Sequence, residues 1–116
     1  MLQIARYDLT PRLCRITTFG RLAFLFLSGD TPAGAPPDYS VQAREVFARL
    51  NGMLATAGTS RAEIVAATLW VASAHACHLV EKQFADWVGC GGRPAVTVVE
   101  GRLAAPGKLI EVGLVC

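Results

Sequence analysis

The sequence predicts an α+β fold, in which two helices pack on one face of a mixed β-sheet. Three observations lead to this prediction. Segments typical of strands and of helices follow one another in the order strand pair, helix, strand, helix, strand pair. Each helix then joins two parallel strands by a right-handed crossover, which places both helices on the same face of the sheet. Two strands are apolar at both odd and even positions, as is typical of strands that are covered on both faces.

The first strands are predicted before residue 29. Residues 12–18 and 21–28 flank a tight turn at Phe19-Gly20, and an additional short strand at residues 3–7 is left open. The segment Gly29–Asp38 is rich in proline, which lacks the amide donor that a helix interior or a central strand needs. We therefore expect this segment to be a loop.

The remaining strands are predicted at residues 64–72, 95–103 and 108–115. Residues 64–72 are again apolar at both parities. The last two strands are joined by Ala104–Gly107, whose proline and glycine favour a tight turn. We therefore expect these two strands to pair as a β-hairpin.

Two helices are predicted between these strands. Residues 40–57 place their apolar side chains on one stripe with helical spacing. Asp38 or Ser40 can cap the start of this helix, and Gly58 is a suitable residue to end it. Residues 76–88 repeat the pattern and form the second helix.

Composition excludes several classes of protein. The 116 residues fit a single domain, residues 1–116, and 53 % of them are hydrophobic while 17 % are charged, below the usual figure of about 25 %, so the chain is not disordered. The longest apolar run, Leu22–Leu27, is far shorter than the roughly 20 residues of a membrane span. The N-terminal residues lack the apolar stretch of a secretory signal, and we expect a cytoplasmic protein. A net charge of +2 is too small to indicate nucleic-acid binding.

The apolar character of the strands also predicts self-association. Two helices on one face leave the other face of the sheet without a cover inside one chain. Because the residues on that face are apolar as well, the exposed surface would be a large apolar patch, which marks an interface. We therefore expect an oligomer in which sheets pack against each other.

Glu111 is the leading candidate for a catalytic residue. It lies in strand 108–115 on the same face as apolar neighbours, where a carboxylate can act as a general acid or as a base that positions water. The alternative is an edge or rim residue that lies in water or is paired with an arginine. Ser28-Gly29, at the end of a buried strand, can offer a hydroxyl and a backbone N–H to a ligand. Glu100 and Arg102 share a strand face, and we interpret them as a solvated pair rather than a site.

A metal site is not expected. His75, Cys77, His78 and Cys90 are the candidate ligands, but their spacing does not match the usual steps of structural zinc sites. The four cysteines form no C-x-x-C pair, and we interpret them as reduced thiols that mostly fill the core.

Three segments, taken together and in order, resemble the reactive-intermediate deaminase family (Rid, or YjgF-like), also described as L-PSP endoribonuclease. They are GRLAFLFLSGDTP, then QAREVFARLNGMLATAGTSRAEIVAATLWVA, then RPAVTVVEGRLAAPGKLIEVGLV. The resemblance extends from about residue 10 to the end of the chain. It implies a chorismate-mutase-like α+β fold and a homotrimer with ligand clefts between its subunits.

The resemblance also implies an activity and roles for particular residues. Active members of the family hydrolyse 2-imino or enamine acids to keto acid and ammonia without a cofactor. The glutamate that positions water matches Glu111, and the Ser-Gly pair that lines the cleft matches Ser28-Gly29. The arginine that binds the substrate carboxylate falls on Val96 in this sequence. A valine cannot form that ion pair.

Two other arginines are candidates for a substitute cation. Arg93 lies three residues before Val96, and Arg12 lies near the start of the first hairpin strand. We include Val98, two residues beyond Val96 on the same strand, among the candidate substrate-binding residues. Activity towards ordinary 2-imino acids depends on whether another cation replaces the arginine.

The expected function is therefore a trimer that binds a small metabolite between its subunits and hydrolyses imines or enamines, without cofactor, metal, nucleic acid or membrane. The alternative is a non-enzymatic small-molecule-binding or regulatory module on the same trimer. Ribonuclease activity, which the family label suggests, is not supported, because the sequence offers neither a paired acid and base nor a basic groove.

Overall fold

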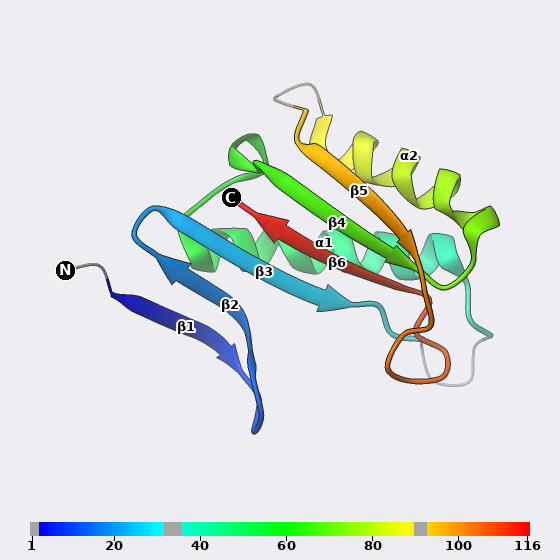
Figure 1. Ribbon diagram of the computed structural model, residues 1–116, viewed down its shortest axis with the longest axis horizontal. Helices are drawn as coiled ribbons and strands as arrows, with labels where there is room; N and C mark the ends of the chain where they lie inside the picture. Colours follow the sequence, from blue (N-terminus) through cyan, green and yellow to red (C-terminus); the bar gives the residue numbers. More distant parts are fainter. Residues whose placement is uncertain (1–2, 32–35, 90–92) are drawn as a thin grey trace.

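The computed structural model describes residues 3–31, 36–89 and 93–116. Six strands and two α-helices are found in these ranges (Figure 1). The strands are β1 (Ile4–Leu9), β2 (Cys14–Phe19), β3 (Leu22–Ser28), β4 (Ala66–Val71), β5 (Ala95–Glu100) and β6 (Ile110–Val115); the helices are α1 (Tyr39–Ala57) and α2 (Cys77–Val88), with short 3₁₀ turns at Arg61–Glu63 and Ala74–Ala76.

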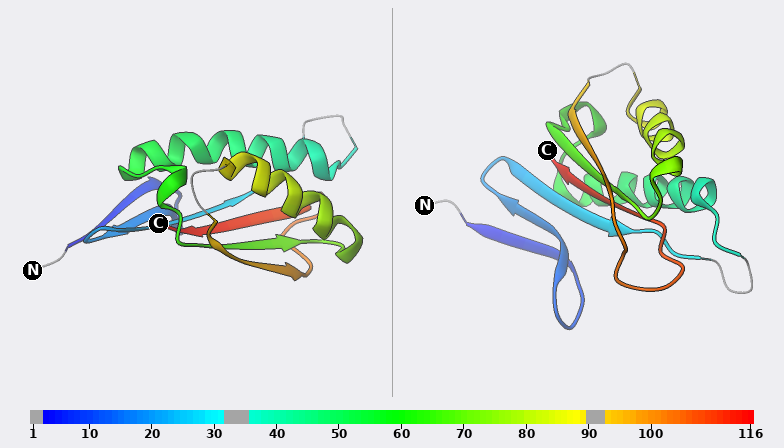
Figure 2. Two further views of the ribbon diagram at one scale, coloured as in Figure 1. Left: turned by 90° about the horizontal axis from the view of Figure 1, so that it is seen from above. Right: turned by 45° about the vertical axis from the view of Figure 1, so that its right-hand side comes forward.

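The strands form one mixed sheet in the order β1-β2-β3-β6-β4-β5. β6 is antiparallel to both β3 and β4, so β3 and β4 run in the same direction, and β5 is parallel to β4. Both α1 and α2 therefore connect parallel strands and cover one face of the sheet, which Figure 2 shows edge-on. The predicted fold class is confirmed, and the strand left open at the N-terminus is present as β1.

The predicted hairpin between the last two strands is wrong. β4 lies between β5 and β6, so that Leu69 is paired with Val98 on one side and with Val112 on the other. The turn residues at 104–107 reverse the chain, but burial decides which strand lies where. Four of the six residues of β6 are buried and this strand takes a central position, whereas β5 is mostly exposed and takes the edge.

Helix α1 is fixed at both ends by its cap residues. The Asp38 carboxylate, rather than Ser40, accepts a hydrogen bond from the Val41 amide, and Gly58 ends the helix with φ of 77°, a left-handed conformation that favours glycine. The side chains of α1 that pack on the sheet are fully or nearly fully buried, as the helical stripe predicts: Ala43, Val46, Phe47, Leu50, Met53 and Leu54.

The sheet face opposite the helices is uncovered, and we call it the open face. Side chains alternate along β3, so Ala23, Leu25 and Leu27 are buried under the helices while Phe26 is 48 % exposed on the open face. Strand pairing places the following residues together on this face: Phe24, Phe26 and Ser28 of β3; Glu111, Gly113 and Val115 of β6; Ala66, Thr68 and Trp70 of β4; and Ala95, Thr97 and Val99 of β5.

None of the helices in the described ranges combines the length and the apolar character that crossing a membrane requires.

Candidate functional site

Ser28 and Glu111 meet on the open face of the sheet. Ser28 is the last residue of β3, Glu111 is the second residue of β6, and the antiparallel register pairs them directly. The Ser28 hydroxyl donates a hydrogen bond of 2.6 Å to Oε1 of Glu111, and the contact is partly buried. The structure thus brings together two candidates that are 83 residues apart in the sequence.

Gly29 allows α1 to pack close behind this pair. Its amide donates to the Ile110 carbonyl at 3.0 Å, which extends the pairing of β3 with β6 by one residue. A Cβ atom at position 29 would lie 2.7 Å from Oε1 of Gln42 on α1, closer than real Cβ contacts come. Glycine is therefore required here for space and not for a special backbone conformation.

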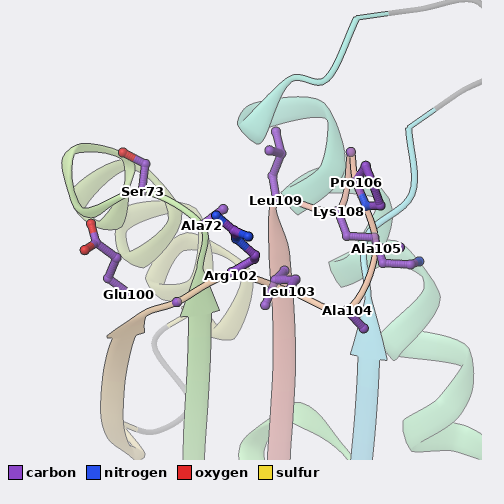
Figure 3. Close-up of a pocket in the computed structure, with 12 residues that line it drawn as sticks. Ala72, Ser73, Glu100, Arg102, Leu103, Ala104, Ala105, Pro106, Lys108 and Leu109 are labelled. Carbon is purple, nitrogen blue, oxygen red and sulfur yellow. The ribbon is translucent and has the colours of Figure 1, made fainter.

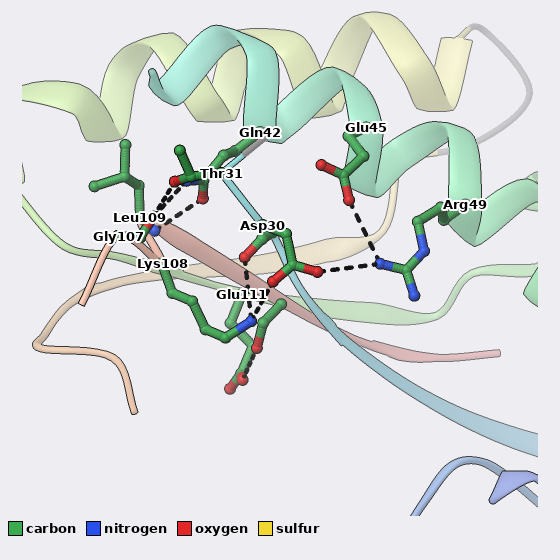
Figure 4. Close-up of polar contacts among 11 residues, drawn as sticks. Asp30, Thr31, Gln42, Glu45, Arg49, Gly107, Lys108, Leu109 and Glu111 are labelled. Carbon is green, nitrogen blue, oxygen red and sulfur yellow. Dashed lines mark hydrogen bonds and ion pairs between the residues drawn. The ribbon is translucent and has the colours of Figure 1, made fainter. Parts of the chain in front are cut away.

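Gln42 supports the two loops at the site, and the sequence alone did not reveal this role. It is fully buried, and its Nε2 donates to Thr31 Oγ1 at 3.0 Å and to the Gly107 carbonyl at 2.5 Å. Its Oε1 accepts from the Leu109 amide at 2.9 Å. One side chain thus ties the loop after β3 to the loop before β6 (Figure 4). The signal in the sequence is a glutamine on the otherwise apolar stripe of helix 40–57.

Lys108 and Asp30 form an ion pair across the same two loops. Nζ of Lys108 lies 2.6 Å from Oδ1 of Asp30, and Arg49 of α1 lies 3.9 Å from Oδ2 (Figure 4). The hydrogen bond from Lys108 holds the pKa of Asp30 below its ordinary value of 3.8, although partial burial opposes this. The stabilising effect of the pair is therefore present above that value and is lost as the pH falls below it.

These residues border one hollow of about 510 Å³, which is lined among others by Leu13, Phe26, Ser28, Lys108 and Glu111. Leu13, Phe26 and Leu27 form its apolar walls. Its charged residues are Arg15 of β2, Asp30, Arg49 of α1, Lys108 and Glu111.

The cations of this hollow are already paired with carboxylates of the same chain. Arg15 lies 3.3 Å from Asp8, Lys108 is held by Asp30, and Arg49 also lies 3.4 Å from Glu45.

The other candidate substrate-binding residues lie elsewhere. Val96 and Val98 pair with Ala67 and Leu69, which are buried under the helices, so they point to the helix side of the sheet. Arg93 and Val96 line a groove against α2. The structure of one chain does not bring these three residues to Glu111.

Arg12 lies in the loop between β1 and β2, where its amide lies 3.4 Å from Thr10 Oγ1. Its neighbour Leu13, and not Arg12 itself, lines the hollow beside Glu111.

Glu100 and Arg102 border a second hollow at the ends of β4 and β5 (Figure 3). Glu100 accepts a hydrogen bond from the Ala74 amide and so holds the 3₁₀ turn after β4. Arg102 lies in the loop before β6, close to Ala72 and Leu103 in Figure 3. The carboxylate is therefore engaged with backbone rather than with the neighbouring arginine.

The structure describes three of the four cysteines and both histidines, and among the described residues these side chains form no metal-binding cluster. Cys14, Cys77 and Cys116 are free thiols, and burial raises the pKa of Cys116 to about 11. His75 lies 2.8 Å from the Ser73 hydroxyl. Within residues 3–31, 36–89 and 93–116 no three histidine, cysteine or acidic side chains are grouped so that they could hold a metal ion. Cys90 lies outside these ranges.

The architecture is that of the YjgF-like proteins. A solved structure of a YjgF family member from Neisseria meningitidis matches 97 % of this chain and 92 % of its own, with a TM-score of 0.84 and 25 % identity. A Rid family protein from Yersinia pestis matches 92 % and 88 % with a TM-score of 0.82 and 21 % identity, and so supports the fold.

A RutC family protein from Haemophilus ducreyi is 25 % identical over 109 residues, which are 94 % of this chain and 92 % of that protein. The sequence model described as endoribonuclease L-PSP matches residues 17–116. The chain belongs to this family.

Proposed function

We propose that three copies of this chain form a trimer, and that a small imine or enamine binds beside Ser28 and Glu111 in a cleft between subunits and is hydrolysed there. The observation that carries the proposal is the 2.6 Å hydrogen bond between these two side chains on the open face. It joins a carboxylate and a hydroxyl, which are suited to proton transfer, at the border of a hollow of about 510 Å³.

The reaction needs one water molecule and a group that accepts and returns a proton. The water oxygen attacks the imine carbon while the Glu111 carboxylate accepts a proton from the water. The proton is then delivered to the nitrogen, which gives a carbinolamine. A second proton passes from the carbinolamine hydroxyl through Glu111 to the nitrogen as the carbon–nitrogen bond breaks, and a carbonyl product and ammonia leave. The Ser28 hydroxyl holds the carboxylate in place through its hydrogen bond. These steps require no cofactor.

Assembly of the trimer through the open face is supported by the residues there. Phe26 and Val99 are 48 % and 37 % exposed in one chain, and Phe24 and Trp70 lie on the same face. Burying such a surface against neighbouring subunits is favourable by about 25 cal/mol for each Å² of apolar area removed from water.

The rival function is a non-enzymatic binding module on the same trimer. It is favoured by one observation: the open-face residues of β5 are Ala95, Thr97 and Val99, so this strand offers no cation to a ligand beside Glu111.

Replacement of Glu111 by glutamine distinguishes hydrolysis from non-enzymatic binding. An oxidase generates the imine in the assay. The rate at which ammonia and the carbonyl product are released is measured and compared with the rate of spontaneous hydrolysis. We expect Glu111→Gln to lower kcat/KM about 10²- to 10⁴-fold, as loss of a general base does, and Ser28→Ala to lower it less. Glu81→Gln, an exposed acid on α2, is the matched control and should keep full activity.

Equal rates for the wild type and Glu111→Gln would contradict the proposed hydrolysis. Equal rates together with saturable binding of a carbonyl analogue would identify the binding module instead.

A further inference from the structure

The Lys108 side chain lies in the wall of the hollow beside Ser28 and Glu111. Its Nζ donates to the carbonyl of Gly29, the residue next to Ser28, at 3.5 Å. Lys108 and Glu111 both border the hollow, and only two residues separate them in the chain. A ligand that binds at Glu111 therefore has a positive charge of the same chain close to it.

The backbone on either side of Lys108 is fixed by hydrogen bonds. The Gly107 carbonyl accepts from Gln42 Nε2 and from the Thr31 hydroxyl, and the Leu109 amide donates to Gln42 Oε1. Gln42 is fully buried. The lysine thus projects from a segment that is already held in place, so less conformational entropy is lost when its ammonium binds a ligand.

The carboxylate that pairs with Lys108 is exchangeable. Nζ of Lys108 lies 2.6 Å from Oδ1 of Asp30 (Figure 4), but the Asp30 side chain is 60 % exposed and the Lys108 side chain only 28 %. Asp30 therefore lies on the solvent side of the pair, and rotation of its side chain into water releases the ammonium. Because exposed ion pairs contribute little to stability, another carboxylate can displace Asp30 at low cost.

The charges around Asp30 attract an anion to the same place. The hydrogen bond from Lys108, together with the charges of Arg49 and Arg15, lowers the pKa of Asp30 against the effect of burial. These three cations all border the hollow, whose acidic lining residues are Asp30 and Glu111. A ligand anion that takes the place of Asp30 meets the same three positive charges.

Lys108 is the best placed of the three cations to bind this anion. Arg15 and Arg49 each pair with a further carboxylate, at 3.3 Å and 3.4 Å, and keep that partner when Asp30 leaves. In the described part of the chain, Asp30 is the only carboxylate paired with Lys108. Displacement of Asp30 therefore leaves the lysine, rather than either arginine, without a counter-ion.

From these observations we infer that Lys108 determines the specificity of the site: its ammonium binds a carboxylate of the ligand, and Asp30 is the internal competitor that this carboxylate displaces. The inference rests on the proposed function and goes beyond it, because it assigns the residue that recognises the charge of the ligand. It concerns a cation that lies in the same chain as Glu111. Groups that a neighbouring subunit brings to the cleft add to this contact and do not replace it.

Two matched probes test the inference by equilibrium binding, without turnover. Pyruvate carries a carboxylate, and pyruvamide is its neutral amide of nearly the same shape. By NMR titration of the wild type we expect a Kd for pyruvate at least ten times lower than for pyruvamide. Lys108→Met should raise the Kd for pyruvate about ten- to a hundredfold, the usual effect of losing one hydrogen bond to a charged group, and should change the Kd for pyruvamide far less.

Asp30→Asn distinguishes a competitor from a structural partner. A neutral amide competes poorly for the ammonium, so this variant should bind pyruvate about two- to fivefold more tightly than the wild type, as release of an exposed ion pair predicts. If Asp30 instead held Lys108 in the position that binds the ligand, the same substitution would weaken binding of pyruvate. The two roles of Asp30 therefore predict changes of opposite sign.

Lys82 and Asp86 of α2 provide the matched control. They form another exposed ion pair, with Nζ 3.8 Å from Oδ2. Lys82→Met and Asp86→Asn make the same changes of net charge away from the hollow and should leave the Kd of both probes unaltered. Mass and melting temperature of all four variants are measured first. If Lys108→Met fails to fold, the sign of the change in Asp30→Asn decides the matter.

The outcomes separate this inference from the hydrolysis on which it rests. Preference for pyruvate that Lys108→Met removes and Asp30→Asn strengthens supports the inference. Equal or undetectable affinity of the wild type for the two probes overturns it, and so does weaker binding of pyruvate by Asp30→Asn. The rate of imine hydrolysis by Glu111→Gln tests the proposed function separately, so either result can fail while the other stands.

Discussion

Gly29 lies so close to α1 that a larger residue at this position would displace its neighbour Ser28. The absence of a side chain at residue 29 lets the buried amide of Gln42 approach the end of β3. A methyl group there would press α1 away from the strand, and Ser28, the adjacent residue, would move relative to Glu111. The geometry of the pair is thus set partly by a residue that makes no contact with it.

Gly29→Ala tests this constraint. We expect the variant to lose about 1–3 kcal/mol of unfolding free energy, the usual effect of overpacking a filled site, and to lose activity because Ser28 and Glu111 separate. Gly52→Ala is the control: nothing lies within 4 Å of a Cβ at that position of α1, and alanine should stabilise the helix by up to about 1 kcal/mol. Urea denaturation gives both values. Equal stability of the two variants would contradict the packing argument.

Single residues also define what the sequence could and could not predict about the site. Ser28 and Glu111 could be chosen as candidates because each is a polar residue in a strand that is otherwise apolar. The side of the sheet to which Val96 points could not be predicted, because β5 has apolar residues on both faces and its pairing with β4 decides which of them face the helices. A shift of one residue moves a side chain to the other face, and the open-face positions are 95, 97 and 99 rather than 96 and 98.

At the scale of elements, one side chain of α1 is hydrogen-bonded to two loops, the loop after β3 and the loop before β6. Gln42 of α1 bonds Thr31 in the loop after β3, and Gly107 and Leu109 in the loop before β6. Lys108 lies between Gly107 and Leu109, which both bond Gln42. Its ion pair with Asp30 therefore forms at the place where Gln42 holds the two loops together. Turn signals in the sequence mark each loop separately, but they contain no information about which side chain joins them.

Gln42→Leu should loosen both loops. The Leu109 amide loses the Gln42 oxygen that accepts from it, whereas the Gly107 carbonyl keeps the Thr31 hydroxyl as a donor. A buried polar group left unsatisfied costs about 1–3 kcal/mol. We expect lower unfolding free energy by urea denaturation and faster hydrogen exchange of the Leu109 amide by NMR.

Gln83→Leu is the matched control for this variant. Gln83 makes a hydrogen bond to Ser40 Oγ, and its Oε1 is buried with no partner in the described part of the chain. Its loss should therefore change stability less than loss of Gln42 and leave exchange at Leu109 unaltered. A similar effect of both substitutions would argue against the role of Gln42 in the loops.

At the scale of the whole molecule, the open face is the apolar surface that no other element of the described chain covers. Its apolar residues were visible in the sequence as strands without alternation. This is one reason why the fold class could be predicted, and it is why we expect a partner for the sheet. The order of the strands could not be predicted in the same way, because the pairing of β6 with β3 and β4 joins segments far apart in the chain.

Phe26→Asp should break the assembly. A carboxylate in the middle of the proposed interface would be buried without a partner, which opposes association. By light scattering at micromolar concentration we expect three times the 12.3 kDa of one chain for the wild type and a smaller mass for Phe26→Asp. Leu79→Asp, at a similarly exposed apolar residue on α2, should retain the wild-type mass. A wild type with the mass of one chain would contradict the trimer.

The central place of β6 bears on how the protein is made in the cell. During synthesis β1, β2, β3 and α1 emerge from the ribosome first, followed by β4, α2 and β5, and β6 follows all of them although it joins the two halves. Until then the inner edges of β3 and β4 have no partner. Unpaired edges and contacts between distant segments slow folding and favour aggregation. The nascent chain is therefore most vulnerable just before its sheet can close, and chaperone binding would be most useful at that stage.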